Sequence, residues 1–233
     1  MSGRRRRAII LADGDVAARA DLDTAWPRWA AGVDRVVAAD GGARHAPELG
    51  LTIDRWVGDG DSLAADEIER LRAAGTRIDL VPADKDESDT ELAIDAAIAD
   101  GAQELIVLGA FGGPRLDHAI ANLSLLAHPG LGGRPTVLLD AGARVRLVQA
   151  PGGDGAALTV PLPGRVGDLV SLIPFGVDVE GVRSSGLRYP LLDETLRSGP
   201  ARGLSNVRLA SDASIVVGRG RLLVIESPVT LSR

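Results

Sequence analysis

Residues 35–62 read RVVAADGGARHAPELGLTIDRWVGDGDS, and this stretch decides the fold that we predict. Twice within it a short β-rich run, at residues 35–39 and again at residues 55–57, passes directly into aspartates and glycines. The same order recurs along the first half of the chain, where β-rich runs alternate with helical patterns. Strands separated by helices of this length form parallel crossover units, so the sequence predicts an α/β region with a mainly parallel sheet.

The elements expected in this region follow from the two periodicities. Strands are expected at residues 7–12, 35–39, 55–57, 77–81, 104–108 and 136–139. Helices are expected at residues 63–74, 90–99 and 115–127.

Beyond about residue 150 the pattern changes. Residues 151–155 (PGGDG) form a turn-rich joint, and short β-rich segments with almost no helical period follow. These segments lie at residues 157–160, 169–173, 177–182, 205–209, 214–217 and 222–226. They predict a small all-β, sandwich-like domain, so we expect an α/β domain over residues 1–150 and a β-rich domain over residues 151–233.

The composition argues against several classes of protein. A formal net charge of −6 disfavours broad nucleic-acid binding. No apolar run approaches the ~18 residues that span a bilayer. The chain has no cysteine, which excludes disulfides and thiolate metal sites and fits a reducing compartment. We therefore expect a soluble, cytoplasmic protein that binds neither nucleic acid nor membrane.

Motifs rich in aspartate and glycine follow the expected strands. They are ADGG at residues 39–42, GDGDS at 58–62, DKDESD at 84–89 and GAFGGPRLDH at 109–118. In open α/β sheets, ligands bind at the carboxyl ends of the strands, so these motifs are expected to converge. Carboxylates beside a glycine turn that opens a helix suit a hydrated magnesium ion bound together with a polyphosphate.

Asp59 and Asp61 are two residues apart on a turn between glycines. In an extended segment, side chains at that spacing point the same way, so both can face one cation. The alternative is an ordinary strand-to-helix loop in which Ser62 caps the helix and the aspartates are solvated.

Ser88 and Glu91 match the S-x-x-E capping box that begins many helices. Asp89 then lies in the first helical turn, where a negative charge is favourable. The capping box leaves Asp84 and Asp86 unexplained, and carboxylates packed this closely favour a shared cation. We therefore expect Asp86 and Asp89 to be functional.

Lys85 is the only lysine among the 26 cationic residues of the chain. It lies inside the densest acidic motif, where a compact ammonium is not interchangeable with the planar fork of arginine. Chance placement explains a single lysine equally well, so the sequence leaves its role open.

The helix expected after the glycine turn has two contrasting faces. With Pro114 at the first helical position, Arg115, His118 and Asn122 fall on one face at 3.6 residues per turn. This polar stripe suits a phosphate or base site, although a solvated helix face is the alternative. The opposite face is expected to be the core stripe, formed by Leu116, Ile120 and Leu123.

Taken in order, these motifs resemble those of the thiamine pyrophosphokinase family. The family pattern runs approximately A-D-G-G, G-D-x-D-S, D-x-D-x-[ST]-D, and a glycine turn with R-x-D-H and A-N. The likeness continues with GLRYPL at residues 186–191 and GLSN at residues 203–206, and so covers about residues 36–226. Two features depart from the pattern: Gly60 stands where a bulky apolar residue is often found, and Pro114 is an extra residue before the arginine.

The resemblance implies a specific reaction and a set of residues for it. The reaction is transfer of the diphosphoryl group of ATP to thiamine, giving thiamine diphosphate and AMP, with magnesium, in a homodimer that binds thiamine near its interface. The implied magnesium ligands are Asp59, Asp61 and Asp86. The implied catalytic residues are Asp59, Asp61, Asp86, Asp89, Arg115 and Asp117. The implied ATP-side residues are Asp40, Gly41, Gly42, Ser88, Gly112, Gly113, His118 and Asn122. The implied thiamine-side residues are Tyr189, Ser205 and Asn206.

Two other functions compete with this one. A pyrophosphokinase acting on another alcohol, such as a pterin, would use the same ATP-side motifs. A non-catalytic nucleotide-binding module is the alternative from a different class, and the full set of carboxylates argues against it.

Overall fold

The computed structural model describes residues 5–150 and 157–229. The turn-rich joint expected at residues 151–155 lies outside the described residues. The chain folds into two compact units, Met1–Asp140 and Ala141–Arg233.

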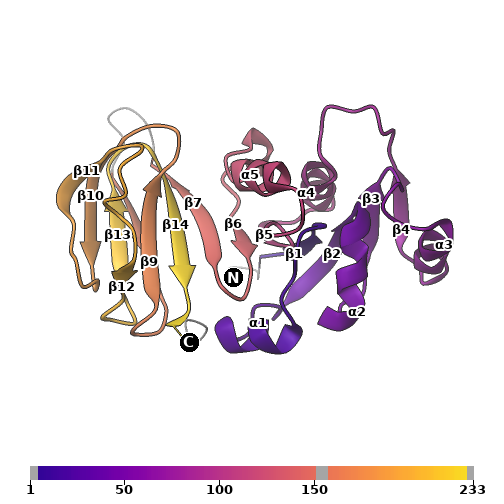
Figure 1. Ribbon diagram of the computed structural model, residues 1–233, viewed down its shortest axis with the longest axis horizontal. Coiled ribbons are helices and arrows are strands. Elements are labelled where there is room, and N and C mark those ends of the chain that lie inside the picture. The colour runs from indigo at the N-terminus through magenta and orange to yellow at the C-terminus, as the bar shows by residue number, and fades with distance from the viewer. Residues whose placement is uncertain (1–4, 151–156, 230–233) are drawn as a thin grey trace. The chain divides into compact units, whose positions relative to one another are not determined.

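The first unit contains a parallel sheet in the order β6-β5-β1-β2-β3-β4 (Figure 1). Its strands are β1 (Arg7–Leu11), β2 (Val33–Ala39), β3 (Arg55–Gly58), β4 (Arg77–Leu80), β5 (Glu104–Leu108) and β6 (Thr136–Leu139). Every expected strand of this region is present, and the prediction of a mainly parallel sheet is confirmed. The strand at its centre, β1, is buried on both faces, with Ala8 to Leu11 fully inaccessible, as is typical of parallel sheets.

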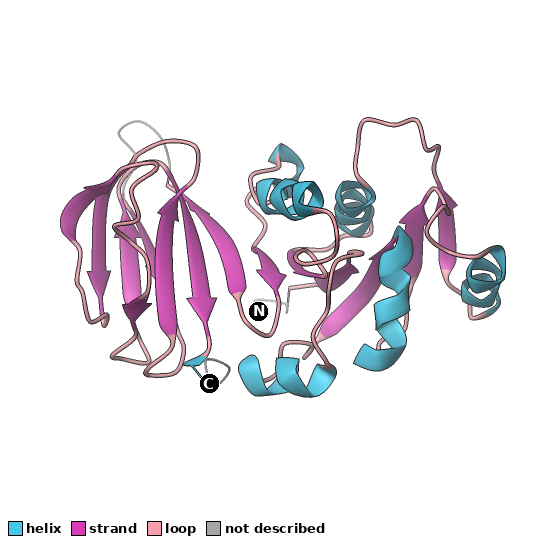
Figure 2. Cartoon of the chain, in the orientation of Figure 1, coloured by secondary structure: helices cyan, strands magenta, loops and turns pink. Residues whose placement is uncertain are grey.

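Helices connect these strands (Figure 2). They are α1 (Arg19–Ala25), the 3₁₀ helix η1 (Asp40–His45), α2 (Ala46–Leu49), α3 (Ala65–Ala73), α4 (Asp89–Ala99), α5 (Leu116–Leu125) and the 3₁₀ helix η2 (Pro129–Leu131). The longest of them, α4, packs across β1, β2 and β3. No helix in the described part of the chain is long and apolar enough to cross a membrane.

The strand order places a topological switch between β1 and β5. From β1 the chain continues outward through β2, β3 and β4, and then returns to the other side of β1 as β5. Ligands of open α/β sheets bind in the crevice outside the carboxyl ends of the strands at such a point. Beyond the ends of the two strands the backbones remain paired, since the N–H of Gly14 donates to the carbonyl of Gly109 at 2.9 Å.

The second unit contains two antiparallel sheets, in the orders β12-β9-β14-β7 and β11-β10-β13-β8. Its strands are β7 (Arg144–Gln149), β8 (Leu158–Pro161), β9 (Leu169–Pro174), β10 (Val179–Ser185), β11 (Leu192–Leu196), β12 (Asn206–Val207), β13 (Ser214–Val217) and β14 (Arg221–Ser227). Strands of both sheets contribute to one hydrophobic cluster, to which Leu172, Leu222 and Val224 belong from one sheet and Val182 and Ile215 from the other.

The prediction of which face of the helix after the glycine turn belongs to the core is wrong. Leu116 is 74% exposed and Ile120 is 57% exposed, whereas Asn122 on the stripe expected to be polar is only 8% exposed. Pro114 is not the first helical residue either, because α5 begins at Leu116 with Arg115 as its N-cap. Helical pitch decides which residues share a face, but it cannot say which face the rest of the protein covers.

Glu226 on β14 is a buried carboxylate of the second unit that contacts three arginines. Its side chain is 1% exposed and receives hydrogen bonds from Arg144 Nε at 2.9 Å and from Arg208 Nη2 at 2.7 Å. Burial alone would raise the pKa of this carboxyl. The Arg144 hydrogen bond and the positive charges of Arg144, Arg146 and Arg208 outweigh burial and lower the pKa below its ordinary value. Arg208 is itself 1% exposed and relies on this carboxylate.

We expect Glu226→Gln to destabilise the protein by about 3 kcal/mol or more, because it leaves the buried Arg208 uncompensated. A group with a lowered pKa stabilises the fold above its unfolded pKa of ~4.3, and the contribution is lost as pH falls through the folded pKa. The deficit of the variant should therefore shrink on acidification. Thermal unfolding from pH 7 down to pH 3 measures it, with the exposed Glu180→Gln as control. Equal midpoints for the two variants at pH 7 would contradict this account.

Candidate functional site

A pocket of about 670 Å³ opens at the carboxyl ends of the parallel strands. Its lining comes from the segments that follow β1, β2, β3, β4 and β5. The aspartates among the lining residues are Asp13, Asp40, Asp59, Asp61, Asp86, Asp89 and Asp117. The expected convergence of the acidic and glycine motifs is confirmed by this pocket.

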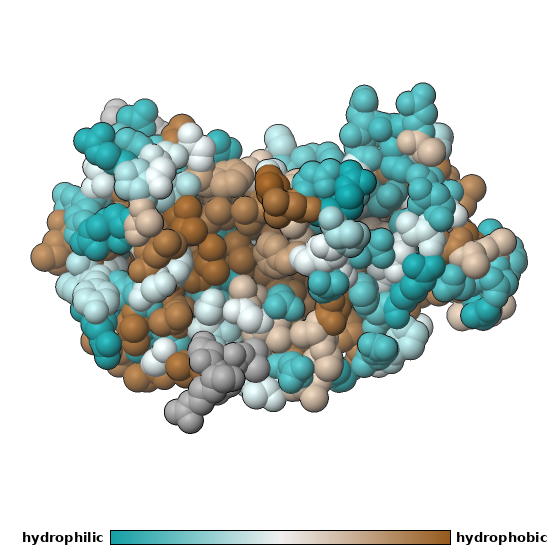
Figure 3. All heavy atoms as spheres, in the orientation of Figure 1, coloured by the Kyte–Doolittle hydropathy of each residue, from teal (hydrophilic) through white to brown (hydrophobic). Residues whose placement is uncertain are grey.

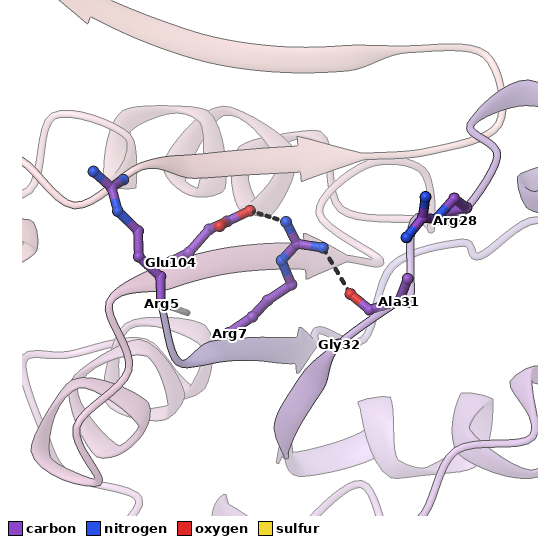
Figure 4. A pocket seen from close by; sticks show the side chains of 6 residues that line it. All are labelled: Arg5, Arg7, Arg28, Ala31, Gly32 and Glu104. Carbon is purple, nitrogen blue, oxygen red and sulfur yellow. Dashed lines mark hydrogen bonds and ion pairs between the residues drawn. The ribbon is translucent and has the colours of Figure 1, made fainter. Parts of the chain in front are cut away.

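A second pocket, of about 510 Å³, lies where β1, β2 and β5 begin, away from their carboxyl ends (Figure 4). Its charged lining residues are Arg5, Arg7, Arg28 and Glu104, and Arg7 is already bound to Glu104 at 2.6 Å and to the carbonyl of Ala31 at 2.9 Å. The described residues that line it include no pair of carboxylates. We therefore assign the chemistry to the first pocket.

Asp40 is held in an unusual conformation at the end of β2. Its φ of 42° lies in the left-handed region, which a residue other than glycine adopts only at a cost. The indole N–H of the fully buried Trp56 donates to its carbonyl oxygen at 2.9 Å and fixes the backbone there. The side chain is 5% exposed, and its Oδ1 has no hydrogen-bond partner among the described residues.

The environment of Asp40 disfavours its charge. Burial raises the pKa of its carboxyl, and the nearby charges of Asp89, Asp61 and Asp59 raise it further against an opposing hydrogen bond with Ser62. A buried carboxylate oxygen without a partner, among like charges, is stabilised by a bound cation.

Asp59 and Asp61 are brought together by the turn after β3. Gly60 between them has a φ of 80°, which glycine adopts without strain, so the departure from the family pattern at this position suits the turn. The N–H of Asp61 donates to Asp59 Oδ1 at 3.0 Å. That hydrogen bond first, and the Lys85 ammonium in addition, lower the pKa of Asp59 despite its desolvation.

Three carboxylates form a group that can hold a metal ion. Asp40, Asp59 and Asp61 each bring one carboxylate oxygen within 4.8 Å of the others. Oxygen ligands of this kind suit magnesium, and the unpartnered Oδ1 of Asp40 adds an observation independent of the acidic sequence. Asp86 lines the same pocket but lies outside this group, so its place among the metal ligands remains a prediction.

Lys85 lies between the turn after β3 and the start of α4. Its Nζ is 3.1 Å from Asp89 Oδ1 and 3.5 Å from Asp59 Oδ2, and its side chain is only 12% exposed. Burial lowers the pKa of this amine, but Asp89 and Asp59 outweigh burial, and the net pKa is raised. The side chain is therefore a charged ammonium at neutral pH.

Ser88 caps α4 as the sequence predicts. Its Oγ accepts a hydrogen bond from the N–H of Glu91 at 3.2 Å, and α4 begins at Asp89. The Glu91 carboxylate lies 3.2 Å from His128 Nε2. The cap directs the first turn of α4, and with it Asp89, toward the pocket.

The glycine turn after β5 is anchored by an aspartate that the sequence motifs did not indicate. Asp15 Oδ2 accepts a hydrogen bond from the N–H of Gly113 at 3.0 Å. A Cβ on Gly112 would lie 2.3 Å from the same carboxylate oxygen, so only glycine allows this approach. Asp13, which lines the pocket directly after β1, was also missed. The sequence could have indicated Asp13, because it follows a strand as the other acidic motifs do.

Arg115 and Asp117 form an exposed pair at the start of α5. The guanidinium donates two hydrogen bonds to the carboxylate, from Nε at 2.9 Å and from Nη2 at 2.6 Å. These bonds lower the pKa of Asp117 to about 2. Both side chains line the pocket, so the guanidinium can exchange this carboxylate for a phosphate.

The remaining residues expected on the ATP side fall into two groups. His118 and Asn122 line the pocket, although Asn122 Nδ2 also donates to the carbonyl of Ala110 at 3.1 Å and so supports the glycine turn. Gly41 and Gly42 are not among the described residues that line it. They are buried, and a Cβ on them would lie 2.3 Å from Asp13 Oδ1 and 2.2 Å from the carbonyl oxygen of Leu11. Their observed part is to let η1 pack closely against the end of β1.

In the second unit, the structure joins Tyr189 to Asn206, whereas the N–H of Ser205 donates to Ser171 Oγ at 3.0 Å. Asn206 is 7% exposed, its Oδ1 accepts from the N–H of Tyr189 at 2.9 Å, and its Nδ2 donates to the carbonyl of Tyr189 at 2.7 Å. The Tyr189 side chain is 57% exposed. Ser205 is exposed and has a φ of 54°. Asn206 thus positions the backbone that presents the tyrosine ring.

Two family models match the chain. One, for thiamin pyrophosphokinase, catalytic domain, matches residues 27–137, and the other, for thiamin pyrophosphokinase, vitamin B1 binding domain, matches residues 157–222. The chain is 25% identical over 199 residues to the thiamine pyrophosphokinase of Bacillus subtilis (strain 168), covering 82% of this chain and 86% of that protein.

Solved structures of similar proteins share the fold. The thiamin pyrophosphokinase of Geobacillus thermodenitrificans matches with a TM-score of 0.77 at 28% identity, over 97% of this chain and 99% of that chain. Yeast thiamin pyrophosphokinase matches with a TM-score of 0.78 over 97% of this chain and 87% of that chain, and its 11% identity supports the fold alone.

Proposed function

The chain belongs to the thiamine pyrophosphokinase family, and from that premise we propose that it transfers the diphosphoryl group of ATP to the hydroxyl of thiamine, giving thiamine diphosphate and AMP. The observation that carries this proposal is the convergence of the carboxylate group and the glycine turn in one pocket at the carboxyl ends of the strands. The matches to both family models favour thiamine over a pterin alcohol, and an enzyme over a binding module.

We propose magnesium as the metal and a division of roles within the pocket. Asp59 and Asp61, with Asp86 or Asp40, would hold the ion, which supplies positive charge to the polyphosphate. Arg115 would leave Asp117 and bind the oxygens of the transferred group, where developing charge needs compensation. The glycine turn would present N–H groups other than that of Gly113, which donates to Asp15, to the phosphates next to the start of α5.

We propose that the first unit is the catalytic domain and that the second binds thiamine. Tyr189, which Asn206 positions, would offer its ring to the vitamin, with Ser205 beside it. The hydrophobic cluster shared by the two antiparallel sheets supports a face-to-face, sandwich-like arrangement of this domain. The lack of cysteine supports the cytoplasm as its compartment.

We also propose that the protein is a homodimer. Leu116 and Ile120 stand one turn apart on α5 and are 74% and 57% exposed, and hydrophobic side chains reach the surface over this helix (Figure 3). A contiguous exposed apolar patch marks a protein interface, and we place the interface at this pair of side chains.

Turnover of ATP to AMP, with thiamine and a pterin alcohol offered separately, tests the activity. We expect AMP with thiamine, and a decrease of about a hundredfold or more in turnover for Asp59→Asn and for Asp61→Asn, partly restored by high magnesium. Charge stabilisation by a metal is worth several kcal/mol, and each ~1.4 kcal/mol is tenfold in rate. Asp66→Asn, an exposed residue of α3, is the matched control. Normal turnover by both variants at limiting magnesium would refute the metal assignment.

Tyr189→Ala is expected to weaken thiamine binding by about 0.5–2 kcal/mol if the ring stacks on the cationic thiazolium or on the pyrimidine. Tyr189→Phe should bind thiamine almost normally because it keeps the aromatic face. Calorimetry with each ligand measures both affinities, and that for ATP should hardly change. An equal loss of affinity for thiamine and for ATP would show that Tyr189 has only a structural role.

Ile120→Asp is expected to convert a dimer into a monomer, because it places a charge among the exposed apolar side chains of α5. Light scattering gives the mass in solution. Val177→Asp, at an exposed position of the second unit, serves as control and should leave the mass unchanged. A wild-type protein with the mass of one chain would reject the homodimer.

A further inference from the structure

The ammonium of Lys85 already neutralises part of the site in which the metal is proposed to bind. It is the only lysine in the chain, its side chain is 12% exposed, and Lys is rarely buried without a reason. Its Nζ contacts Asp59, one member of the candidate metal group, and Asp89, which begins α4. One positive charge thus joins two loops that would otherwise repel each other.

Lys85 contacts residues that line the pocket but is not among the described lining residues itself. The lining residues that its ammonium contacts are Asp59 and Asp89. A divalent ion in the pocket and this ammonium would both use the carboxylate of Asp59.

We propose that Lys85 is a positioning residue that acts as an exchangeable counter-ion: it holds Asp59 and Asp89 in place while the site has no metal, and the metal displaces it from Asp59. This inference rests on the metal-binding part of the proposed function. The 3.5 Å contact with Asp59 is the longer of its two contacts, and Asp89 at 3.1 Å retains the ammonium after the exchange.

The choice of lysine over arginine follows from this exchange. An ammonium is a compact charge on a flexible stem, with three donors that can turn from one acceptor to another. A guanidinium would engage both carboxylates through a planar fork and would not release one of them easily. Of the 26 Lys and Arg residues, all except Lys85 are arginine. Position 85 is therefore the only one at which the chain uses lysine.

The test measures Mn²⁺ binding by calorimetry without nucleotide or thiamine. Lys85→Met removes a positive charge that competes with the metal, so we expect Mn²⁺ to bind tighter by on the order of tenfold. Its turnover should nevertheless fall, because Asp59 and Asp89 lose their support. Damage to the structure alone would lower Mn²⁺ affinity and turnover together. A higher Mn²⁺ affinity combined with a lower turnover therefore identifies a counter-ion.

Two further variants serve as controls. Lys85→Arg keeps the charge and should bind Mn²⁺ no more tightly than the wild type. Arg72→Met, on the exposed surface of α3, makes the same change in net charge away from the pocket and should leave Mn²⁺ affinity unchanged. Unchanged or weaker Mn²⁺ binding by a folded Lys85→Met protein would overturn the proposal.

A measurement on the wild-type protein does not depend on whether Lys85→Met folds. Because Lys85 is the only lysine, an amine-acetylating reagent followed by mass spectrometry of its peptide reports on this side chain alone. We expect Mn²⁺ to speed acetylation of Lys85, relative to a lysine peptide added as reference, since the ion releases it from Asp59. Unchanged or slower acetylation would overturn the proposal.

These outcomes are separable from those for the proposed function. If Lys85→Met binds Mn²⁺ more tightly but the wild-type protein makes no AMP with thiamine, the proposed function is rejected and this inference stands. Normal turnover of thiamine by the wild type, with no gain in Mn²⁺ affinity for Lys85→Met, would reject the inference alone.

Discussion

Electrostatic repulsion among carboxylates at one edge of a parallel sheet is the constraint on which the rest of the site depends. Parallel strands end at the same edge, so the aspartates that follow β2, β3 and β4 are brought close together by the topology. The carboxyl of Asp40 shows the effect, since burial and its neighbours raise its pKa. The fold tolerates this because Trp56 fixes the backbone of Asp40 and because Lys85 supplies an internal positive charge.

The two units use charge in opposite ways. In the second unit, Glu226 and Arg208 are both about 1% exposed and contact each other at 2.7 Å, so solvent hardly reaches this pair. In the first unit, the side chains of Arg115 and Asp117 form a pair and are both 63% exposed. An open pair costs little to separate, whereas separating a buried one leaves an unpaired charge in an apolar environment. The accessible pair is therefore the one suited to exchange partners with a substrate.

The sequence predicted the parts of the structure that depend on short-range pattern. The strands of the parallel sheet, the Ser88 cap and the convergence of the acidic motifs are all present. It did not predict β7 or β11, and it assigned the wrong face of α5 to the core. Which face of a helix is covered, like the contact of Asp15 with the glycine turn, depends on chain segments about a hundred residues apart. Asp13 was missed although the rule that identified its neighbours applies to it.

The clamp that Asn206 forms on Tyr189 uses only the main chain of residue 189. The amide of Asn206 bonds to a main-chain N–H and a main-chain carbonyl, which any residue other than proline provides. These two hydrogen bonds therefore place no constraint on the side chain at position 189. The aromatic ring there can therefore be exchanged for another side chain without rebuilding the β-unit around it. Position 206 has no such freedom, because no other side chain offers the same donor and acceptor at that length. We therefore expect the side chain at position 189 to vary among related chains and the asparagine at position 206 to be retained.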